Sequence, residues 1–516
     1  MMTVATIQPD MRWQFGSTLG DALRRCPLWA WAVLLTIVLA ALSMMRPIDH
    51  DESQYVAAAV LSGEGLLPYR DYAYLQTPLQ PLLFGPLARL LSEFAYPGLR
   101  LVNALLGALA IVFVYRAARA GGVPVRVAFA ASALFAGTDI LLFGTGLARN
   151  DALPLALFAG ALWLIVAGGE RRTPAAAVAI GLLLAAAAAA KASYALPAAA
   201  YGLWTLWDRS HRPFWVALGA AVPVALVLAL ADQAPEAFWF GAFVFPADAP
   251  EQYYAGGARA YKLTLGFRLL DLLKFSALGA TLPALVVIVW RLRDARERVD
   301  TLLELLILAS LLSAVLPEPT WRQYLLPVLP PLFLRLARIW RLSAPARRQR
   351  AVFALFAVAG LVPTLLAFGA AVTDGLPMTR ALREGDAVEA LLDAEAAHGP
   401  VATLAPHLLP ATGRLPDRRF ATGPFYFRSH GLLSHAEEGR FHLVSGARLA
   451  AGDLPRVVLL GGESQWAGGD SALEALVARV ASARPVRVLS LSGTRLRVLL
   501  LGPPQAARAR RSSKPS

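Results

Sequence analysis

Long apolar runs separated by short polar stretches fill the chain up to Thr373. A helix needs about 20 apolar residues to cross the hydrocarbon core of a bilayer. About eleven runs approach that length, so the pattern predicts a polytopic α-helical membrane protein. The expected spans are Trp29 to Met45, Leu99 to Arg116, Val125 to Gly144, Ala152 to Gly168, Pro174 to Ala190, Ala192 to Trp207, Phe214 to Ala231, Leu272 to Trp290, Leu302 to Leu316, Tyr324 to Trp340 and Ala351 to Thr373.

Two apolar runs need a separate interpretation. The first, Trp29 to Met45, is long for a signal peptide and no small-x-small cleavage site precedes Arg46, so we interpret it as an uncleaved span. The run Leu79 to Leu91 is short and contains Pro81 and Pro86. We expect it to be interfacial or re-entrant.

Composition agrees with a membrane protein. The chain has 57% hydrophobic and 16% charged residues, whereas soluble domains carry about 25% charge. This excludes a single-core soluble enzyme and a disordered scaffold. The single cysteine, Cys26, excludes an internal disulfide framework and a cysteine-based zinc site.

The net charge of +14 is first a topology signal and does not indicate nucleic acid. With a cytoplasmic N-terminus, every loop expected inside is basic, and the loops expected outside carry the acids and many aromatics. The expected inner loops are Arg116 to Arg126, Gly168 to Arg172, Asp208 to Arg212, Arg291 to Arg298 and Arg335 to Arg350; the expected outer loops are Pro47 to Gly98, Gly144 to Asp151, Asp232 to Arg268 and Pro317 to Gln323.

After Thr373 the apolar runs give way to alternating polar and apolar residues. The pattern predicts a small soluble α/β domain over residues 374–516, on the outer side, with a basic tail from Arg508 to Lys514. We expect helices over Thr379 to Ala397 and Ser471 to Ala483, and strands over Val401 to Leu404, Arg456 to Leu460, Val486 to Leu491 and Arg495 to Leu501.

Three carboxylates follow the first span directly. The run Asp49 to Tyr55 reads Asp-His-Asp-Glu-Ser-Gln-Tyr, which places Asp49, Asp51 and Glu52 at the outer membrane surface. Acids there suit general-base chemistry on a hydroxyl or metal binding. The alternative is a charged helix N-terminus, where acids favour the positive end of the dipole.

Several short motifs then follow in order along the membrane part. They are Asp51-Glu52-x-x-Tyr55, Gly65-x-x-Pro68-Tyr69-x-Asp71, Pro78-Leu79, Arg149-x-Asp151 before a span, Lys191 after a span, and Arg322-x-Tyr324-Leu325-Leu326-Pro327. In this order they resemble the GT-C membrane glycosyltransferases, in particular the branch of protein O-mannosyltransferases and lipid A aminoarabinose transferases. The resemblance covers most of the membrane part, and the Asp-Glu pair after the first span is its most specific element.

The resemblance implies transfer of a sugar from a polyprenyl-phosphate carrier to an acceptor on the non-cytoplasmic side, with Asp51 at the position of the catalytic acidic residue. One motif departs from the family. Relatives often have Lys-Pro-Pro, with the lysine near the donor phosphate, where this chain has Gln76-Thr77-Pro78. Donor phosphate binding then rests on other cations, or the donor differs.

The residues suit this chemistry. Transfer needs a base for the acceptor proton and cations for the charge on the departing phosphate. We expect Asp51 to be the base, with Asp49 or Glu52 as alternatives, and Arg149, Lys191 and Arg322, all at outer ends of spans, to bind the phosphate. The alternative for these cations is snorkelling to the interface. We assign substrate binding to Tyr55, Tyr69, Asp71, Gln76, Asp151 and Tyr324.

Two acids and one histidine leave alternatives open. Asp139 and Asp151 are each a possible partner of Arg149, and Asp151 is alternatively a helix cap; we favour a structural ion pair for Asp139 and a supporting role in the site for Asp151. His50 beside two acids invites a divalent metal, but a lone histidine is weak evidence for one. We assign no metal and no other cofactor.

The sequence therefore favours an inverting glycosyltransferase. Its expected partners are a polyprenyl-phosphate-linked sugar, membrane lipids, and a glycan, lipid or protein acceptor, with no nucleic acid. Its expected location is the bacterial cytoplasmic membrane, with the C-terminal domain periplasmic or extracellular. The main alternative is a secondary transporter or flippase, although the acids cluster on one face and no matching second half is present. A third possibility is an assembly protein that binds polyprenyl carriers without needing the Asp51 base.

Overall fold

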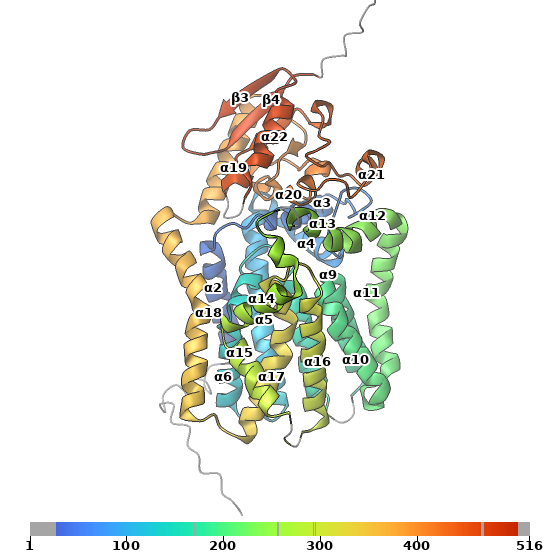
Figure 1. Cartoon of the computed structure of the whole chain (residues 1–516), viewed down its shortest axis with the longest axis vertical. Coiled ribbons are helices and arrows are strands. Elements are labelled where there is room, and N and C mark those ends of the chain that lie inside the picture. The colour runs from blue at the N-terminus through green and yellow to red at the C-terminus, as the bar shows by residue number, and fades with distance from the viewer. Residues whose placement is uncertain are drawn as a thin grey trace, which may run out of the picture.

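Helices form a bundle with a smaller domain at one end (Figure 1). The computed structural model describes residues 27–169, 172–254, 257–292, 294, 296–465 and 469–503. Cys26 and the basic tail from Arg508 to Lys514 lie outside the described residues. The predicted fold class, a polytopic helical protein with a small C-terminal α/β domain, is confirmed.

Most expected spans correspond to one helix each. Among the described residues, four helical segments are long and apolar enough to cross a membrane, and two bent helix pairs raise this number to six. The count of eleven therefore stays a prediction. The helices of the bundle are α2 Leu28–Met45, α5 Ala95–Ala120, α8 Ala152–Ala167, α9 Pro174–Ala190, α10 Ala195–Trp207, α11 Pro213–Gln233, α16 Arg298–Val315, α17 Leu329–Leu342 and α18 Arg347–Asp374.

Two expected spans are bent pairs rather than single straight helices. The run Val125 to Gly144 forms α6 Val125–Ala136 and α7 Asp139–Thr145, with a bend of 66°. The run Leu272 to Trp290 forms α14 Leu265–Ala277 and α15 Thr281–Trp290, with a bend of 102°. Apolarity alone does not distinguish a straight helix from a broken one, because both bury the same side chains.

The two breaks contact each other, and this contact explains both bends. The backbone N–H of Asp139 donates to the carbonyl of Leu278 at 3.0 Å. Gly279 adopts a φ of +126°, which favours glycine. Gly360 of α18 packs against both breaks so closely that an added Cβ would lie 2.4 Å from the carbonyl oxygen of Gly137. Small residues thus let three helices meet where α7 begins.

The first loop and the loop after α11 cover the end of the bundle next to the smaller domain (Figure 1). The run Leu79 to Leu91 is helix α4, which packs on α3 through Gly63 and Gly85. Its interfacial or re-entrant position stays a prediction. The elements of the two loops are α3 Glu52–Gly63, α4 Leu79–Leu91, η1 Ser92–Phe94, α12 Pro235–Trp239, the π-helix η4 Phe240–Val244, α13 Phe245–Tyr254 and η5 Ala260–Leu263.

The C-terminal domain has the predicted elements. Its four-stranded sheet has the order β1-β2-β4-β3, with β1 parallel to β2 and the other pairs antiparallel. The turn between β3 and β4 contains Gly493 at a φ of +75°. The main elements are α19 Pro377–Ala394, β1 Val401–Ala402, α20 Pro424–Phe427, α21 His435–Arg440, β2 Val457–Leu460, α22 Ser471–Ala481, β3 Val486–Ser490 and β4 Arg497–Leu501.

The C-terminal domain packs directly on the loops of the membrane part. Phe240 and Phe245 share a buried apolar cluster with Tyr426 and Phe441. Gly423 lies so close to α3 that an added Cβ would be 2.4 Å from Ser53 Oγ. Burial of this apolar surface holds the domain over the residues that follow the first span.

We expect Gly360→Ala to lower the thermal unfolding temperature in detergent, because the new methyl group would overlap backbone atoms at the junction of α6, α14 and α18. Overpacking of this kind costs about 1–3 kcal/mol. Gly369→Ala in the same helix is the matched control, since nothing lies within 4 Å of its added Cβ. The control should be neutral or stabilising by about 0.5–1 kcal/mol. Equal shifts in the two variants would contradict the proposed close contact.

Candidate active site

A fully buried ion pair lies at the centre of the acidic run. Arg100 of α5 and Glu52 of α3 are both 0% exposed, and the Nη2 and Nε atoms of Arg100 donate to the Glu52 carboxylate at 2.5 and 2.8 Å. The Tyr96 hydroxyl and the Ala148 backbone N–H donate to the same carboxylate at 2.8 and 2.7 Å. A buried charge needs such complete pairing. The pair therefore ties the first loop to α5 and to the loop before α8.

Asp49 and Asp51 lie beside this pair and face Arg149. The Asp51 carboxylate forms an ion pair with Nη1 of Arg149, and Asp49 lies 3.5 Å from the same nitrogen. The side chain of Asp51 is 21% exposed and that of Asp49 is 26% exposed, whereas the Glu52 side chain is 0% exposed. Asp49 and Asp51 are therefore the acids of the run that a substrate can reach.

Arg149 continues the network towards Lys191. Its Nε atom donates to Asp151 at 3.1 Å, and the other oxygen of Asp151 forms an ion pair with Lys191. Asp151 stands at the N-cap position of α8, but its side chain makes no capping hydrogen bond. Asn103 of α5 fixes this loop by donating to the carbonyl of Arg149 at 2.8 Å.

A third cation approaches from the segment before α17. Arg322 pairs with Asp139 at 2.8 Å, and its guanidinium lies 3.5 Å from the centre of the Phe143 ring. The guanidinium of Arg149 lies 5.3 Å from the same ring. The helix break before Asp139 thus places a carboxylate where it holds Arg322 close to Arg149.

The two accessible carboxylates differ in pKa. Burial raises the pKa of Asp51, but the charges of Arg149 and the other nearby cations together outweigh burial and hold the pKa below its ordinary value. Burial and the neighbouring Asp51 raise the pKa of Asp49. Asp51 is therefore the member of the pair that stays ionised most readily.

Asp49, His50 and Asp51 offer one ligand atom each within 4.8 Å of one another, which fits a divalent cation. His50 Nε2 lies 3.2 Å from Asp51 Oδ1. The guanidinium of Arg149 already contacts both carboxylates, so it would compete with a metal ion. We assign no metal to this cluster.

The remaining expected site residues divide into two groups. Tyr324 lies close to Lys191, whose Nζ is 5.9 Å from the tyrosine ring centre. Tyr69 is buried and donates its hydroxyl to the carbonyl of Gln76, so it shapes the first loop. Asp71 pairs with Arg70 at 2.7 Å.

Tyr55 of α3 is buried, and it packs in an aromatic cluster with Tyr69 and Tyr74. Its hydroxyl is close enough to Asp51, Asp151, Arg149 and Tyr324 to interact electrostatically with them. Among the expected substrate-binding residues, the described structure thus gathers Tyr55, Asp151 and Tyr324 around Arg149. It places Asp71 and the Tyr69 hydroxyl in contacts of the first loop itself.

Sequence reasoning missed several residues of the network. Arg100 and Asn103 stand inside an apolar run, and a polar side chain there was the available signal. Phe143 gave no signal, because one phenylalanine in an apolar helix is ordinary. Arg46 was seen only as the boundary of the first span; its guanidinium lies 5.7 Å from the Phe143 ring centre.

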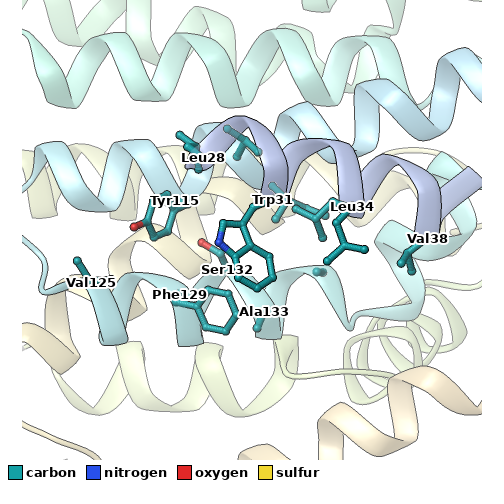
Figure 2. A pocket seen from close by; sticks show the side chains of 13 residues that line it. Leu28, Trp31, Leu34, Val38, Tyr115, Val125, Phe129, Ser132 and Ala133 are labelled. Atoms are coloured by element: carbon teal, nitrogen blue, oxygen red, sulfur yellow. The ribbon is translucent and has the colours of Figure 1, made fainter. Parts of the chain in front are cut away.

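A separate apolar groove opens between α2, α5 and α6 (Figure 2). Its volume is about 380 Å³, and Trp31, Tyr115, Phe129 and Ser132 are among its lining side chains. Its lining contains no carboxylate and no cation, so it cannot supply the acid and phosphate chemistry of the network around Arg149.

Comparison with known proteins identifies the architecture. No protein-family model matches the chain, and no curated protein sequence matches it either. The crystal structure of ArnT from Cupriavidus metallidurans in the apo state superposes with a TM-score of 0.60 at 17% identity, over 94% of this chain and 98% of that chain. ArnT bound to undecaprenyl phosphate gives 0.58 at 16% identity, over 91% and 97%.

The chain shares the fold of ArnT. The predicted resemblance is confirmed for the fold. An archaeal oligosaccharyltransferase from Archaeoglobus fulgidus is more distant, with a TM-score of 0.48 at 14% identity, over 89% of this chain and 73% of that chain. The long apolar helices and this fold agree with a multi-pass membrane protein.

We expect Arg100→Met to destabilise the protein strongly, because it leaves the Glu52 carboxylate buried without a counter-charge. Breaking such a pair costs about 3–5 kcal/mol. Arg291→Met is the matched control, since Arg291 pairs with Asp294 on the surface, where ion pairs contribute about 0–1 kcal/mol. Unfolding in mixed detergent micelles measures both. A loss in Arg100→Met no larger than in the control would contradict a structural role for the buried pair.

The same pair predicts a pH dependence. Although burial raises the pKa of Glu52, the charge and hydrogen bonds of Arg100 lower it below its ordinary value of 4.5 in the folded protein. Stability from the ionised carboxylate is thus complete above that ordinary value and is lost as the pH falls through the lower folded value. We expect the stability difference between wild type and Glu52→Gln to narrow on acidification below about pH 4.5. A difference that stays constant in thermal unfolding from pH 7 to pH 3.5 would contradict this assignment.

Proposed function

We propose that this protein is an inverting glycosyltransferase that moves a sugar from a polyprenyl phosphate to a hydroxyl acceptor. The observation that carries the proposal is the accessible Asp51 carboxylate held by Arg149 in a GT-C fold. A polyprenyl-phosphate donor is supported by the related fold of ArnT, which was crystallised with undecaprenyl phosphate. The acceptor class is a hydroxyl of a glycolipid, polysaccharide or protein.

In the proposed reaction the Asp51 carboxylate accepts the proton of the acceptor hydroxyl. The acceptor oxygen attacks the anomeric carbon while the bond from that carbon to the phosphate oxygen breaks. The bonding electrons leave with the polyprenyl phosphate, and the configuration at the anomeric carbon inverts. Arg149, Lys191 and Arg322 would stabilise the negative charge on the departing phosphate. Glu52 would act as a positioning residue, since its oxygens already accept hydrogen bonds from Arg100, Tyr96 and Ala148.

Ligand binding would change the balance around Arg149. In the free protein this guanidinium contacts Asp49, Asp51 and Asp151. A donor phosphate that takes part of this charge would weaken the pair with Asp51 and raise the pKa of that carboxylate. The proton affinity of the base would therefore increase when donor is present.

We also propose the placement that the charge pattern predicts. Residues 1–373 would form the catalytic membrane domain, and residues 374–516 would form a domain on the periplasmic or extracellular side of a bacterial cytoplasmic membrane. The basic loops would face the cytoplasm.

Asp51→Asn tests the proposed base. We expect at least a 100-fold loss of transfer of labelled sugar from a panel of polyprenyl-phosphate sugars to membrane-extract acceptors, because general-base catalysis contributes about 10²–10⁴-fold. Donor binding should persist. Donor hydrolysis is followed in parallel, since water is a poor acceptor.

Glu64→Gln is the matched control in the same loop, because Glu64 is an exposed residue at the end of α3. It should keep wild-type turnover. If the wild-type protein consumes no donor and instead moves a solute across the membrane of reconstituted vesicles, the protein is a transporter and the glycosyltransferase proposal fails. Full turnover by Asp51→Asn would show that Asp51 is not the base.

A further inference from the structure

The C-terminal domain reaches the candidate active site through one short segment around α20. The Phe425 ring lies 5.9 Å from the His50 ring, and Gly423 packs against Ser53. His50 and Ser53 both belong to the run Asp49 to Tyr55, which contains Asp51. The segment therefore forms part of the wall next to the accessible carboxylates.

Tyr253 of α13 fastens this segment to the membrane part. Its hydroxyl donates to the carbonyl of Phe425 and lies 2.9 Å from Ser429 Oγ. The backbone N–H of His430 donates to the Gln252 side chain at 3.1 Å. Contacts on both sides of residue 428 thus fix its backbone over the site.

Arg428 stands between these contacts and is held by aromatic rings. Its guanidinium carbon lies 4.4 Å from the Tyr253 ring centre and 5.5 Å from the Phe425 ring centre. Stacking of this kind holds a guanidinium while its edge stays free for hydrogen bonds. The side chain is half-buried, and its Nε atom is buried without a hydrogen-bond partner among the described residues.

Arg428 differs from the other cations at the site in its lack of an ion-pair partner among the described residues. Arg149, Lys191 and Arg322 each form an ion pair with at least one carboxylate. No carboxylate of the described chain lies within ion-pair distance of Arg428. The Phe425 ring lies between Arg428 and His50, the neighbour of Asp51, at 5.5 and 5.9 Å from them. The charge of Arg428 acts on Asp51, where it helps to lower the pKa, and also on Glu463.

We propose that Arg428 of the C-terminal domain binds a phosphate group of the substrate at the Asp51 site, so that this domain completes the site. The inference rests on the proposed function, because a polyprenyl phosphate is the expected phosphate source; a phosphate on the acceptor is the other source. A planar guanidinium without a carboxylate partner suits bidentate recognition of phosphate oxygens. The tyrosine and phenylalanine rings orient it before substrate arrives.

The test measures binding of undecaprenyl phosphate in detergent micelles to the full-length protein, without any transfer reaction. We expect Arg428→Met to weaken binding about 10- to 100-fold, because a charge-assisted hydrogen bond is lost. Arg428→Lys should recover part of the loss, since it keeps the charge but not the fork. Arg479→Met, an exposed arginine at the end of α22 in the same domain, is the matched control and should bind like wild type.

A purely structural role is separated by Tyr253→Phe. This variant loses the hydroxyl contacts to Phe425 and Ser429 and the interaction of the hydroxyl with Arg428, but it keeps the ring under Arg428. It should lower the unfolding temperature but weaken binding much less than Arg428→Met, because the charge of Arg428 remains. Weak binding in Arg428→Met at an unchanged unfolding temperature supports the phosphate contact. Equal affinity loss in Tyr253→Phe and Arg428→Met, without rescue by lysine, would overturn it.

The outcomes separate the two proposals and the two phosphate sources. If wild type binds no undecaprenyl phosphate, the proposed donor fails. If wild type binds it and Arg428→Met binds equally well, Arg428 does not hold the donor phosphate. Competition by inorganic phosphate is then compared in wild type and Arg428→Met with undecaprenyl phosphate absent, using a phosphorylated glycolipid as the bound probe. If wild type and Arg428→Met differ only with the phosphorylated glycolipid, Arg428 binds the acceptor phosphate. If the two proteins differ with neither ligand, the proposal is overturned.

Discussion

The buried pair of Glu52 and Arg100 is the interaction on which the rest of the site depends. Both side chains are shielded from solvent, and Glu52 also accepts from Tyr96 and from the backbone before α8. One carboxylate therefore joins the first loop, α5 and the loop that carries Arg149. An unpaired charge in this position would be very unfavourable, so the pair favours this arrangement of the three segments.

The accessible charges are built on that frame. Asp151 bridges Arg149 and Lys191, and Asp139 holds Arg322 beside the Phe143 ring. The free site is thus close to electrically balanced. Pairing the cations with carboxylates avoids the cost of several unpaired charges near the membrane when no phosphate is bound. The phosphate of the proposed donor would compete with the carboxylates for the same guanidinium groups, which would couple donor binding to the proton affinity of Asp51.

Sequence patterns predicted the helices and strands well, but they did not predict the bends and the contacts between helices. Apolar runs located the helices of the bundle, and period-two alternation with a Gly493 turn located the hairpin of the C-terminal domain. The 66° and 102° bends were missed, because glycine and threonine in an apolar run are equally compatible with a continuous helix. Gly360 of a distant helix packs against both breaks, and local propensity does not contain such a tertiary contact.

The same limit applies to the site. The order of motifs singled out Asp51, Arg149, Asp151, Lys191 and Arg322, since charges at the ends of apolar runs stand out. Arg428 did not stand out, because an arginine in a polar domain is ordinary by composition; only the fold brings it to the rings of Tyr253 and Phe425. The proposed division of the site between the helical bundle and the C-terminal domain has a physical consequence. The acids of the first loop are held by the buried pair of Glu52 and Arg100, whereas Arg428, the proposed phosphate-binding cation, depends on the docking of the C-terminal domain. Any loosening of that docking would therefore change the charge at the site without disturbing the buried pair beneath it.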